Sequence, residues 1–209
     1  MKHKLLTGEE FKVINLFRDN LLQTYTIREI MDKLRKNSYN WVFNTIKKLE
    51  NMEIVTIESK GGSHLCSFNM NHPLALSYLS LSEKLKITDK LPLKNIRELI
   101  GNSPFSYFSF FVTGSYARGD YTKKSDLDIV VIVEAGDDTK KMFSVLKNKG
   151  DLMLPRVHLY VFSKNEFLKM LLDKEENYGK EIFRNHIILF GAENYYLILR
   201  EAVFHGFKG

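Results

Sequence analysis

Two aspartates, Asp126 and Asp128, stand two positions apart at the start of an apolar run that ends at Val133. The length and β-branched content of this run predict a strand. Residues two apart on a strand point to the same face, so we expect both carboxylates to project together while Leu127 faces the core. Carboxylates held side by side repel each other, and a hard divalent cation such as Mg²⁺ relieves that repulsion. The spacing therefore predicts a magnesium site formed by Asp126 and Asp128.

A turn suited to phosphate groups precedes the aspartates. Another apolar run, residues 108–112, predicts a strand that leads into Gly114 and Ser115. Glycine lets the backbone approach a ligand closely, and the serine stands where a short helical turn can begin, so N–H groups and a hydroxyl can address an anion. Arg118 and Lys124 add positive charge to the same loop. An anion-binding turn that faces a carboxylate pair is the layout that binds a nucleoside triphosphate with Mg²⁺.

The segments GSYARG and SDLD, from Gly114 to Asp128, resemble the GSxARG…SDxDL signature of polymerase-β-type nucleotidyltransferases, particularly the minimal nucleotidyltransferases of prokaryotes. The resemblance implies that Asp126 and Asp128 are catalytic and coordinate Mg²⁺. It implies a nucleotide-binding set that consists of Gly114, Ser115, Arg118, Lys124 and Ser125. The implied reaction moves a nucleoside monophosphate from a nucleoside triphosphate, with ATP as the expected donor, to an acceptor hydroxyl. The alternative is a solvated loop before a strand, without chemistry.

A third carboxylate is not evident. Active members of the family usually carry one on a later strand, where it acts as general base toward the acceptor hydroxyl. Residues 156–161 predict that strand, and His158 lies near the expected position. A neutral imidazole can accept a proton near neutral pH, but it is a poor ligand for Mg²⁺. His158 is equally well explained as an ordinary strand residue, so transfer is left open while metal and nucleotide binding are expected.

Residues 1–86 predict a separate N-terminal domain. Thr7, Thr26 and Ser38 each precede apolar residues at helical spacing, which predicts three capped helices. Two short apolar runs follow, with a turn at residues 59–63 between them, and they predict a β-hairpin. This pattern, and the segment SYNWVFNTIKKLENMEIV in particular, resembles a winged helix-turn-helix domain.

The winged-helix resemblance implies contact with DNA. In such domains the third helix enters the major groove and the hairpin contacts the DNA backbone. Asparagines of the helix are expected to reach base edges, and lysines to contact phosphates. The expected DNA-binding residues are Asn40, Asn44, Lys47, Lys48 and Lys60. The net charge of +6 favours an anionic partner without identifying it. The alternative is a dimerisation or protein-docking module.

Residues 93–209 predict the second domain. Beyond the strands described above, the pattern predicts a surface helix at 138–149, and then two helices, a short strand and a final helix. The predicted fold class is α+β: a winged helix-turn-helix followed by a nucleotidyltransferase-fold domain with a small mixed β-sheet flanked by helices.

The composition sets limits on the class of protein. The chain has 209 residues, 44% of them hydrophobic, which is enough for packed cores. A single cysteine, Cys66, excludes an internal disulfide and a multi-cysteine zinc site. No stretch has the length of a membrane helix, and the N-terminal segment MKHKLLTGEEF lacks the apolar region of a signal peptide. We therefore expect a cytoplasmic protein without a membrane partner.

Two functions stay open. The first is a nucleotidyltransferase, whose acceptor, by the family resemblance, can be a HEPN-type partner protein modified by an antitoxin. The second is a DNA-binding transcriptional regulator or antitoxin whose transferase domain binds nucleotide without catalysis. A homodimer is compatible with both.

Overall fold

The computed structural model describes residues 5–209, which form two compact units divided between Ser82 and Glu83. Residues 1–4, where the predicted first domain and the N-terminal segment without signal features begin, lie outside the described residues. The division falls within helix α4 (Pro73–Lys86). The domain boundaries at 1–86 and 93–209 stay predictions.

The first unit contains helices and a small antiparallel sheet. Its elements are α1 (Gly8–Asp19), β1 (Tyr25–Thr26), α2 (Ile27–Lys33), α3 (Tyr39–Asn51), β2 (Val55–Lys60), β3 (Ser63–Phe68) and the first part of α4. The strand order is β1-β3-β2. Thr7 and Thr26 close capping boxes at the starts of α1 and α2, and the Ser38 hydroxyl accepts from the N–H of Trp41 at the start of α3. These caps fix where each helix begins.

The hairpin turn is tighter than predicted. The ladder between β2 and β3 runs from Val55 opposite Phe68 to Lys60 opposite Ser63, so the turn contains only Gly61 and Gly62 instead of residues 59–63. Both glycines have positive φ angles, +56° and +77°. A two-residue turn of this kind requires two residues in that region, which glycine reaches without steric cost.

The core of this unit is formed by the inward stripes of its helices. Val42, Ile46 and Leu49 of α3 are fully buried, as their spacing predicted. Cys66 is buried as a small apolar residue, and burial raises the pKa of its thiol to about 11. The element order is the one expected of a winged helix-turn-helix, and that assignment stays a prediction.

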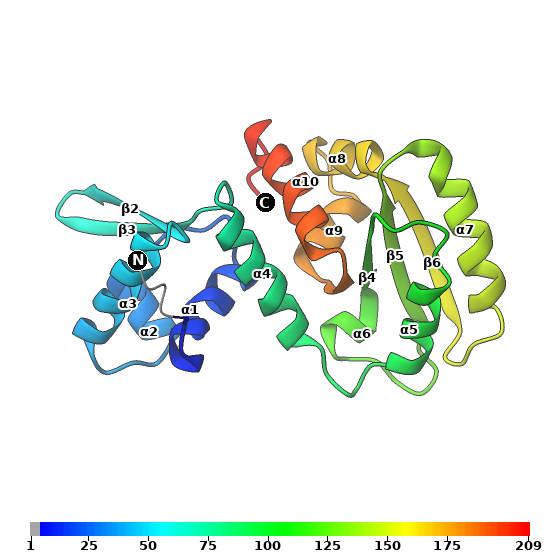
Figure 1. The fold of residues 1–209 in the computed structure, drawn as a ribbon, viewed down its shortest axis with the longest axis horizontal. Helices are drawn as coiled ribbons and strands as arrows, with labels where there is room; N and C mark the ends of the chain where they lie inside the picture. Colours follow the sequence, from blue (N-terminus) through cyan, green and yellow to red (C-terminus); the bar gives the residue numbers. More distant parts are fainter. Residues whose placement is uncertain (1–4) are drawn as a thin grey trace. The chain divides into compact units, whose positions relative to one another are not determined.

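The second unit is built on a mixed four-stranded sheet (Figure 1). Its elements after α4 are α5 (Leu93–Gly101), β4 (Phe108–Val112), α6 (Gly114–Arg118), β5 (Leu127–Val133), α7 (Gly136–Gly150), β6 (Val157–Ser163), α8 (Lys164–Leu172), α9 (Tyr178–Arg184), β7 (Ile187–Phe190) and α10 (Ala192–Phe204). The strand order is β6-β5-β4-β7, with β5 and β6 parallel and the other pairs antiparallel. The prediction of an α+β protein with small sheets flanked by helices is confirmed.

One face of this sheet packs against α5 and α7. Val112, Ile129 and Leu159 from three neighbouring strands join Ile96 of α5 and Met142 of α7 in one buried cluster. Every second residue of a strand belongs to this cluster, and the residues between them face the other side of the sheet, as the period of two of a β-strand requires.

The opposite face packs against α8 to α10. The ring centroid of Phe111 on β4 lies 5.2 Å from that of Tyr195 on α10, which in turn lies 6.1 Å from that of Phe167 on α8. Ile182 of α9 is also fully buried. Because both faces are covered, every residue of β4 is buried, including Ser109. Rigid, covered strands of this kind hold the residues at their ends in fixed positions.

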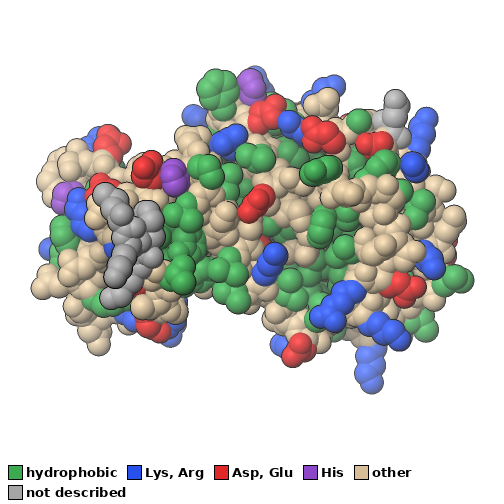
Figure 2. Space-filling model, in the orientation of Figure 1, with side chains coloured by type: hydrophobic (Ala, Val, Ile, Leu, Met, Phe, Trp, Pro, Cys, Tyr) green, Lys and Arg blue, Asp and Glu red, His purple; other side chains and the backbone are tan. Residues whose placement is uncertain are grey.

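Charge is spread over the surface. Figure 2 shows Lys and Arg side chains interspersed with Asp and Glu over the visible face of each unit, so the net charge of +6 is not gathered in one patch there. Within residues 5–209, no helix combines the length and the apolar character that crossing a membrane requires.

Candidate active site

The turn after β4 and the start of β5 lie at the same end of the sheet. The strands are antiparallel neighbours, with Val112 opposite Ile129. The pairing continues one step further, because the N–H of Thr113 donates to the carbonyl oxygen of Asp128 at 3.0 Å. The antiparallel register therefore brings the predicted phosphate-binding turn to the first residues of the strand that carries Asp128.

Gly114 packs directly against the carboxylate of Asp128. A Cβ atom on residue 114 would lie 2.1 Å from Oδ2 of Asp128, and the φ angle of Gly114 is +61°. Both the space and the backbone conformation therefore require glycine at this position. The sequence predicted that Gly114 lets a ligand approach the backbone closely. In the structure the group that lies close to Gly114 is the carboxylate of Asp128.

The carboxylate of Asp128 is partly withdrawn from solvent. Burial raises its pKa, and the nearby charge of Asp126 raises it further, whereas His158 and Arg118 act in the opposite direction. The net pKa of Asp128 is raised, because the desolvation outweighs the positive neighbours. The ionised form of Asp128 is therefore destabilised by its surroundings, and a bound cation would stabilise it.

His158 is the residue of β6 that faces Asp128. The two residues are paired in the β5–β6 register, and Nδ1 of His158 lies 3.4 Å from Oδ1 of Asp128. The imidazole is 59% exposed, so it is accessible from solvent as well as to the carboxylate. The family resemblance predicts a third carboxylate on β6. The β6 side chain that faces Asp128 is instead the imidazole of His158.

The donor set fits a partly protein-held Mg²⁺. Asp126 and Asp128 would supply carboxylate oxygens, and among the side chains that the structure describes no group of three or more His, Cys, Asp or Glu is arranged to hold a metal. Mg²⁺ commonly takes only one or two protein carboxylates and completes its octahedron with water and substrate phosphates. Two carboxylates are therefore enough for this ion when water and a phosphate-bearing substrate supply the other oxygens.

The loop between α6 and β5 has its own internal contacts. Nε of Arg118 lies 3.2 Å from Oδ2 of Asp120, and Arg118 also contributes to the electrostatics of Asp128. The Ser125 hydroxyl accepts from the N–H of Thr122 at 2.9 Å, and thereby stabilises the turn. Lys124 is exposed. The fold brings the predicted residues Gly114 and Arg118 to Asp128, whereas Ser125 is engaged within the loop.

The helix that begins at Gly114 is short. α6 contains five residues, and Ser115 is its second. The first N–H groups of a helix have no partner within it. Local backbone N–H groups and the Ser115 hydroxyl, not the dipole of a long helix, are therefore the groups that the turn offers to phosphate.

An aromatic wall beside Asp128 was missed by the sequence reasoning. The hydroxyls of Tyr178 and Thr113 lie 3.2 Å apart, and the ring centroid of Tyr178 is 4.8 Å from that of Tyr160. Tyr160 is in turn 4.8 Å from the ring of His158, and burial raises the pKa of Tyr178 to about 12. The alternation of His158, Tyr160 and Phe162 on β6 was a usable signal, because these side chains share one face of the strand.

A polar pocket of about 470 Å³ adjoins Asp126. Lys147 of α7 and Arg156, just before β6, line it together with His158. Lys147 forms an ion pair with Asp151. Arg156 and the paired Lys147 thus place two cationic side chains beside Asp126, which the sequence reasoning did not anticipate.

The predicted DNA-binding residues lie on α3 and the hairpin of the first unit. Asn40 and Asn44 are exposed on α3, and Lys60 is exposed beside the hairpin turn. Two lysines are already paired: Nζ of Lys47 lies 2.8 Å from Glu50, and Nζ of Lys48 lies 2.7 Å from Glu10. Contact with DNA stays a prediction for all five: Asn40, Asn44, Lys47, Lys48 and Lys60.

The match to a protein family lies in the second unit. The family model described as "Nucleotidyltransferase domain" matches residues 95–186. "Putative protein adenylyltransferase MJ0141" of Methanocaldococcus jannaschii is 31% identical over 71 residues, which are 33% of this chain and 72% of that protein. "Putative protein adenylyltransferase MJ1547" of the same organism is 31% identical over 87 residues, 41% of this chain and 57% of that protein. No solved structure gives a significant match.

Proposed function

The chain belongs to the nucleotidyltransferase family, and we propose that it transfers an adenylyl group from ATP to a hydroxyl group of an acceptor protein. The observation that carries the proposal is the contact of Gly114 with Asp128, which joins the turn and the carboxylate in one site. Two relatives whose names describe protein adenylyltransferases support ATP as donor and protein as acceptor.

Asp126 and Asp128 would hold Mg²⁺ in this reaction. When bound, the ion supplies positive charge to the triphosphate and to the departing pyrophosphate. The raised pKa of Asp128 supports this assignment, since a desolvated carboxylate beside a second acid is the group that a cation stabilises. Asp126, exposed just before β5, lines the pocket next to it.

The other residues of the site have distinct roles. Ser115 and the N–H groups at the start of α6 bind the β- and γ-phosphates, and Arg118 offsets their charge. The acceptor oxygen attacks the α-phosphorus, an O–P bond forms, and the bond from the α-phosphorus to the bridging oxygen of pyrophosphate breaks. The general base in this proposal is His158, which would take the hydroxyl proton when its imidazole is neutral; its contact with Asp128 and its exposure support this role.

Labelled ATP tests the proposal. The protein is incubated with Mg²⁺, a panel of candidate acceptor proteins, and ATP labelled at either the α- or the γ-phosphate. Adenylyl transfer requires label on the acceptor from α-labelled ATP only, and its loss in Asp126→Asn and Asp128→Asn. Glu98→Gln, an exposed carboxylate on α5, is the matched control. Transfer from γ-labelled ATP, or transfer that survives Asp126→Asn, would contradict the proposal.

The alternative of a DNA-binding regulator without catalysis is not favoured, because the family match and both relatives concern transferases. We keep the winged helix-turn-helix as a proposal for the first unit, supported by three helices followed by a two-stranded hairpin. The HEPN-type partner and the homodimer stay predictions.

A further inference from the structure

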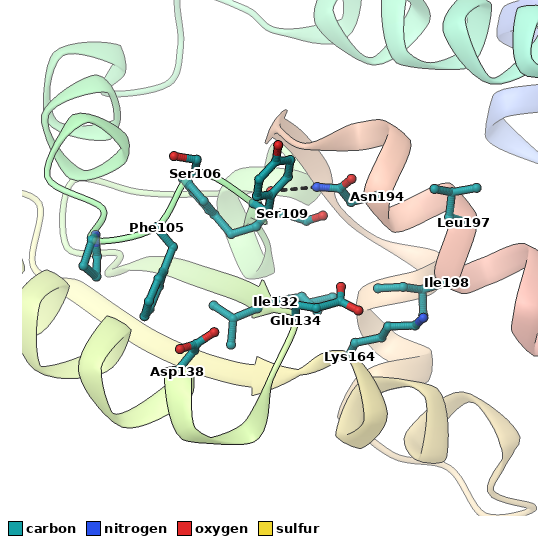
Figure 3. A pocket seen from close by; sticks show the side chains of 14 residues that line it. Phe105, Ser106, Ser109, Ile132, Glu134, Asp138, Lys164, Asn194, Leu197 and Ile198 are labelled. Atoms are coloured by element: carbon teal, nitrogen blue, oxygen red, sulfur yellow. Dashed lines mark hydrogen bonds between the residues drawn. The ribbon is translucent and has the colours of Figure 1, made fainter.

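A second pocket lies at the other end of the same strands. It has a volume of about 690 Å³ and is formed by the start of β4, the end of β5, the segment before β4, and helices α7, α8 and α10 (Figure 3). Asp128 stands near the start of β5, whereas Ile132 and Glu134 at its far end line this pocket. A ligand here would therefore not share the space of the proposed nucleotide site.

The walls of this pocket are largely apolar. Figure 3 shows Phe105 on one side and Leu197 and Ile198 of α10 on the other, with Ile132 between them. Tyr107, also in the lining, is 80% exposed. A pocket of several hundred Å³ with aromatic and aliphatic walls is of the size and character that binds a small organic molecule.

Three side-chain donors of the lining, on Ser109, Asn194 and Lys164, already have partners inside the protein, whereas Ser106 and Tyr107 add hydroxyls that can either donate or accept. The Ser109 hydroxyl donates to the carbonyl oxygen of Gly191 at 2.8 Å, and Nδ2 of Asn194 donates to that of Phe108 at 3.5 Å. Nζ of Lys164 lies 3.1 Å from the carboxylate of Glu201.

The acceptors are in the opposite situation. Within the part of the chain that the structure describes, the carboxylates of Glu134 and Asp138 have no hydrogen-bond or ion-pair partner, and both line the pocket. A ligand that complements these two carboxylates must therefore supply positive charge. Nζ of Lys141 lies 5.3 Å from the ring centroid of Phe105, but Lys141 is not one of the residues that line the pocket.

The helix N-termini at this end of the sheet do not change the preference of the pocket for positive charge. α7, α8 and α10 begin here, and free helix N-termini favour anions. At α8, however, the carboxylate of Glu166 accepts from the N–H of Ser163, and Asp138 lies in the first turn of α7. Glu193 lies in the first turn of α10. The protein's own acids thus already complement these helix starts.

We propose that this pocket binds a small organic cation with an aromatic or aliphatic body, which packs between Phe105 and Leu197 while its ammonium group pairs with Glu134 and Asp138. The site is separate from the proposed transferase site and does not depend on that function.

A matched set of probes tests the charge and the place together. Tryptamine, tryptophol and indole-3-acetate share one ring system and carry a positive, no and a negative charge, respectively. Each is titrated into the full ¹⁵N-labelled chain, and amide shifts are followed by NMR. We expect tryptamine to shift Phe105, Asn194 and Leu197, and to bind about fivefold more tightly than tryptophol, since two exposed ion pairs contribute modestly. Indole-3-acetate should bind most weakly.

Substitutions assign the carboxylates. The double variant Glu134→Gln/Asp138→Asn should bind tryptamine about fivefold more weakly and tryptophol as before. Glu98→Gln, an exposed carboxylate outside the lining, should change neither, and circular dichroism confirms that the variants are folded. The proposal is overturned if the three probes bind alike, if indole-3-acetate binds most tightly, if the shifts lie elsewhere, or if the double variant binds tryptamine normally.

Discussion

Gly114 and Asp128 are in contact across the end of the β4–β5 pair, with room for a hydrogen but not for a methyl group on residue 114. Fourteen positions of sequence separate the two residues, and the antiparallel register places them together. Residue 114 therefore meets two requirements at once: its backbone has a positive φ angle, and it carries no side chain that would collide with the Asp128 carboxylate.

The first prediction separates these two requirements. Gly114→Ala and Gly119→Ala both place alanine at positive φ, +61° and +82°, but only residue 114 has a neighbour within 4 Å of the added carbon. Each substitution should cost about 1 kcal/mol of unfolding free energy through the backbone. Gly114→Ala should in addition displace Asp128 and abolish ATP binding, as measured by calorimetry. Equal ATP affinities in the two variants would contradict the contact.

The second prediction concerns Asp128 and pH. Its pKa is raised in the folded protein above the ordinary value of 3.8, chiefly by burial, so the folded state binds the proton more tightly than the unfolded state. Stability should therefore fall as pH rises from below 3.8 through the folded pKa, and should stay lower at neutral pH. Asp128→Asn should unfold at higher urea concentration than the original protein at pH 7, although it loses transfer activity. The difference should shrink toward pH 3; a variant that is less stable at pH 7 would refute this.

A third prediction addresses the metal. ATP with Mg²⁺ at about one hundred times its dissociation constant should stabilise the protein by about 2.7 kcal/mol, and EDTA should remove most of that gain. Asp126→Asn and Asp128→Asn should show little stabilisation by either mixture, whereas Glu98→Gln should respond like the original protein. Thermal unfolding measures all four proteins. If EDTA leaves the effect of ATP unchanged, the carboxylates do not act through a divalent ion.

The fourth prediction distinguishes two lysines that were both assigned to DNA. Burial raises the pKa of Glu10, but hydrogen bonds from Lys48 and Thr7 outweigh it, and the net pKa is lowered. Lys48→Ala breaks this partly buried pair and should cost about 1 kcal/mol of stability. Lys60→Ala, on the exposed hairpin, should change stability by less than about 0.5 kcal/mol.

DNA binding of the same two variants is read by fluorescence anisotropy at several salt concentrations. If the hairpin contacts phosphate, Lys60→Ala should weaken binding to every sequence and reduce the salt dependence by about one ion. Unchanged binding and salt dependence would remove Lys60 from any DNA contact.

The local parts of the site could be predicted from the sequence. Gly114 begins the short helix after β4 and Asp128 lies at the start of the next strand, so one short motif carries both residues and the loop between them. The buried stripe of Val42, Ile46 and Leu49 followed directly from helical spacing.

Contacts between distant segments could not be predicted in the same way. Tyr178 reaches Thr113 from 65 positions away, and no periodicity links α9 to the end of β4. Glu83 reads as an ordinary polar residue of α4, but it is 1% exposed and accepts a hydrogen bond from Tyr196, which follows 113 positions later. Lys48 looked free for phosphate because its partner Glu10 is on another helix.

The position of β4 between β5 and β7 has a consequence for the folding of the nascent chain. β5 can pair with β4 as soon as residue 133 is made, but the other edge of β4 pairs with β7 and waits for residues 187–190. Until then a row of backbone amides and carbonyls on β4, four of whose five residues are apolar, lacks its partner. Nascent chains arrested between these two points should therefore aggregate, and chaperone demand should peak there and end once the last strand emerges from the ribosome.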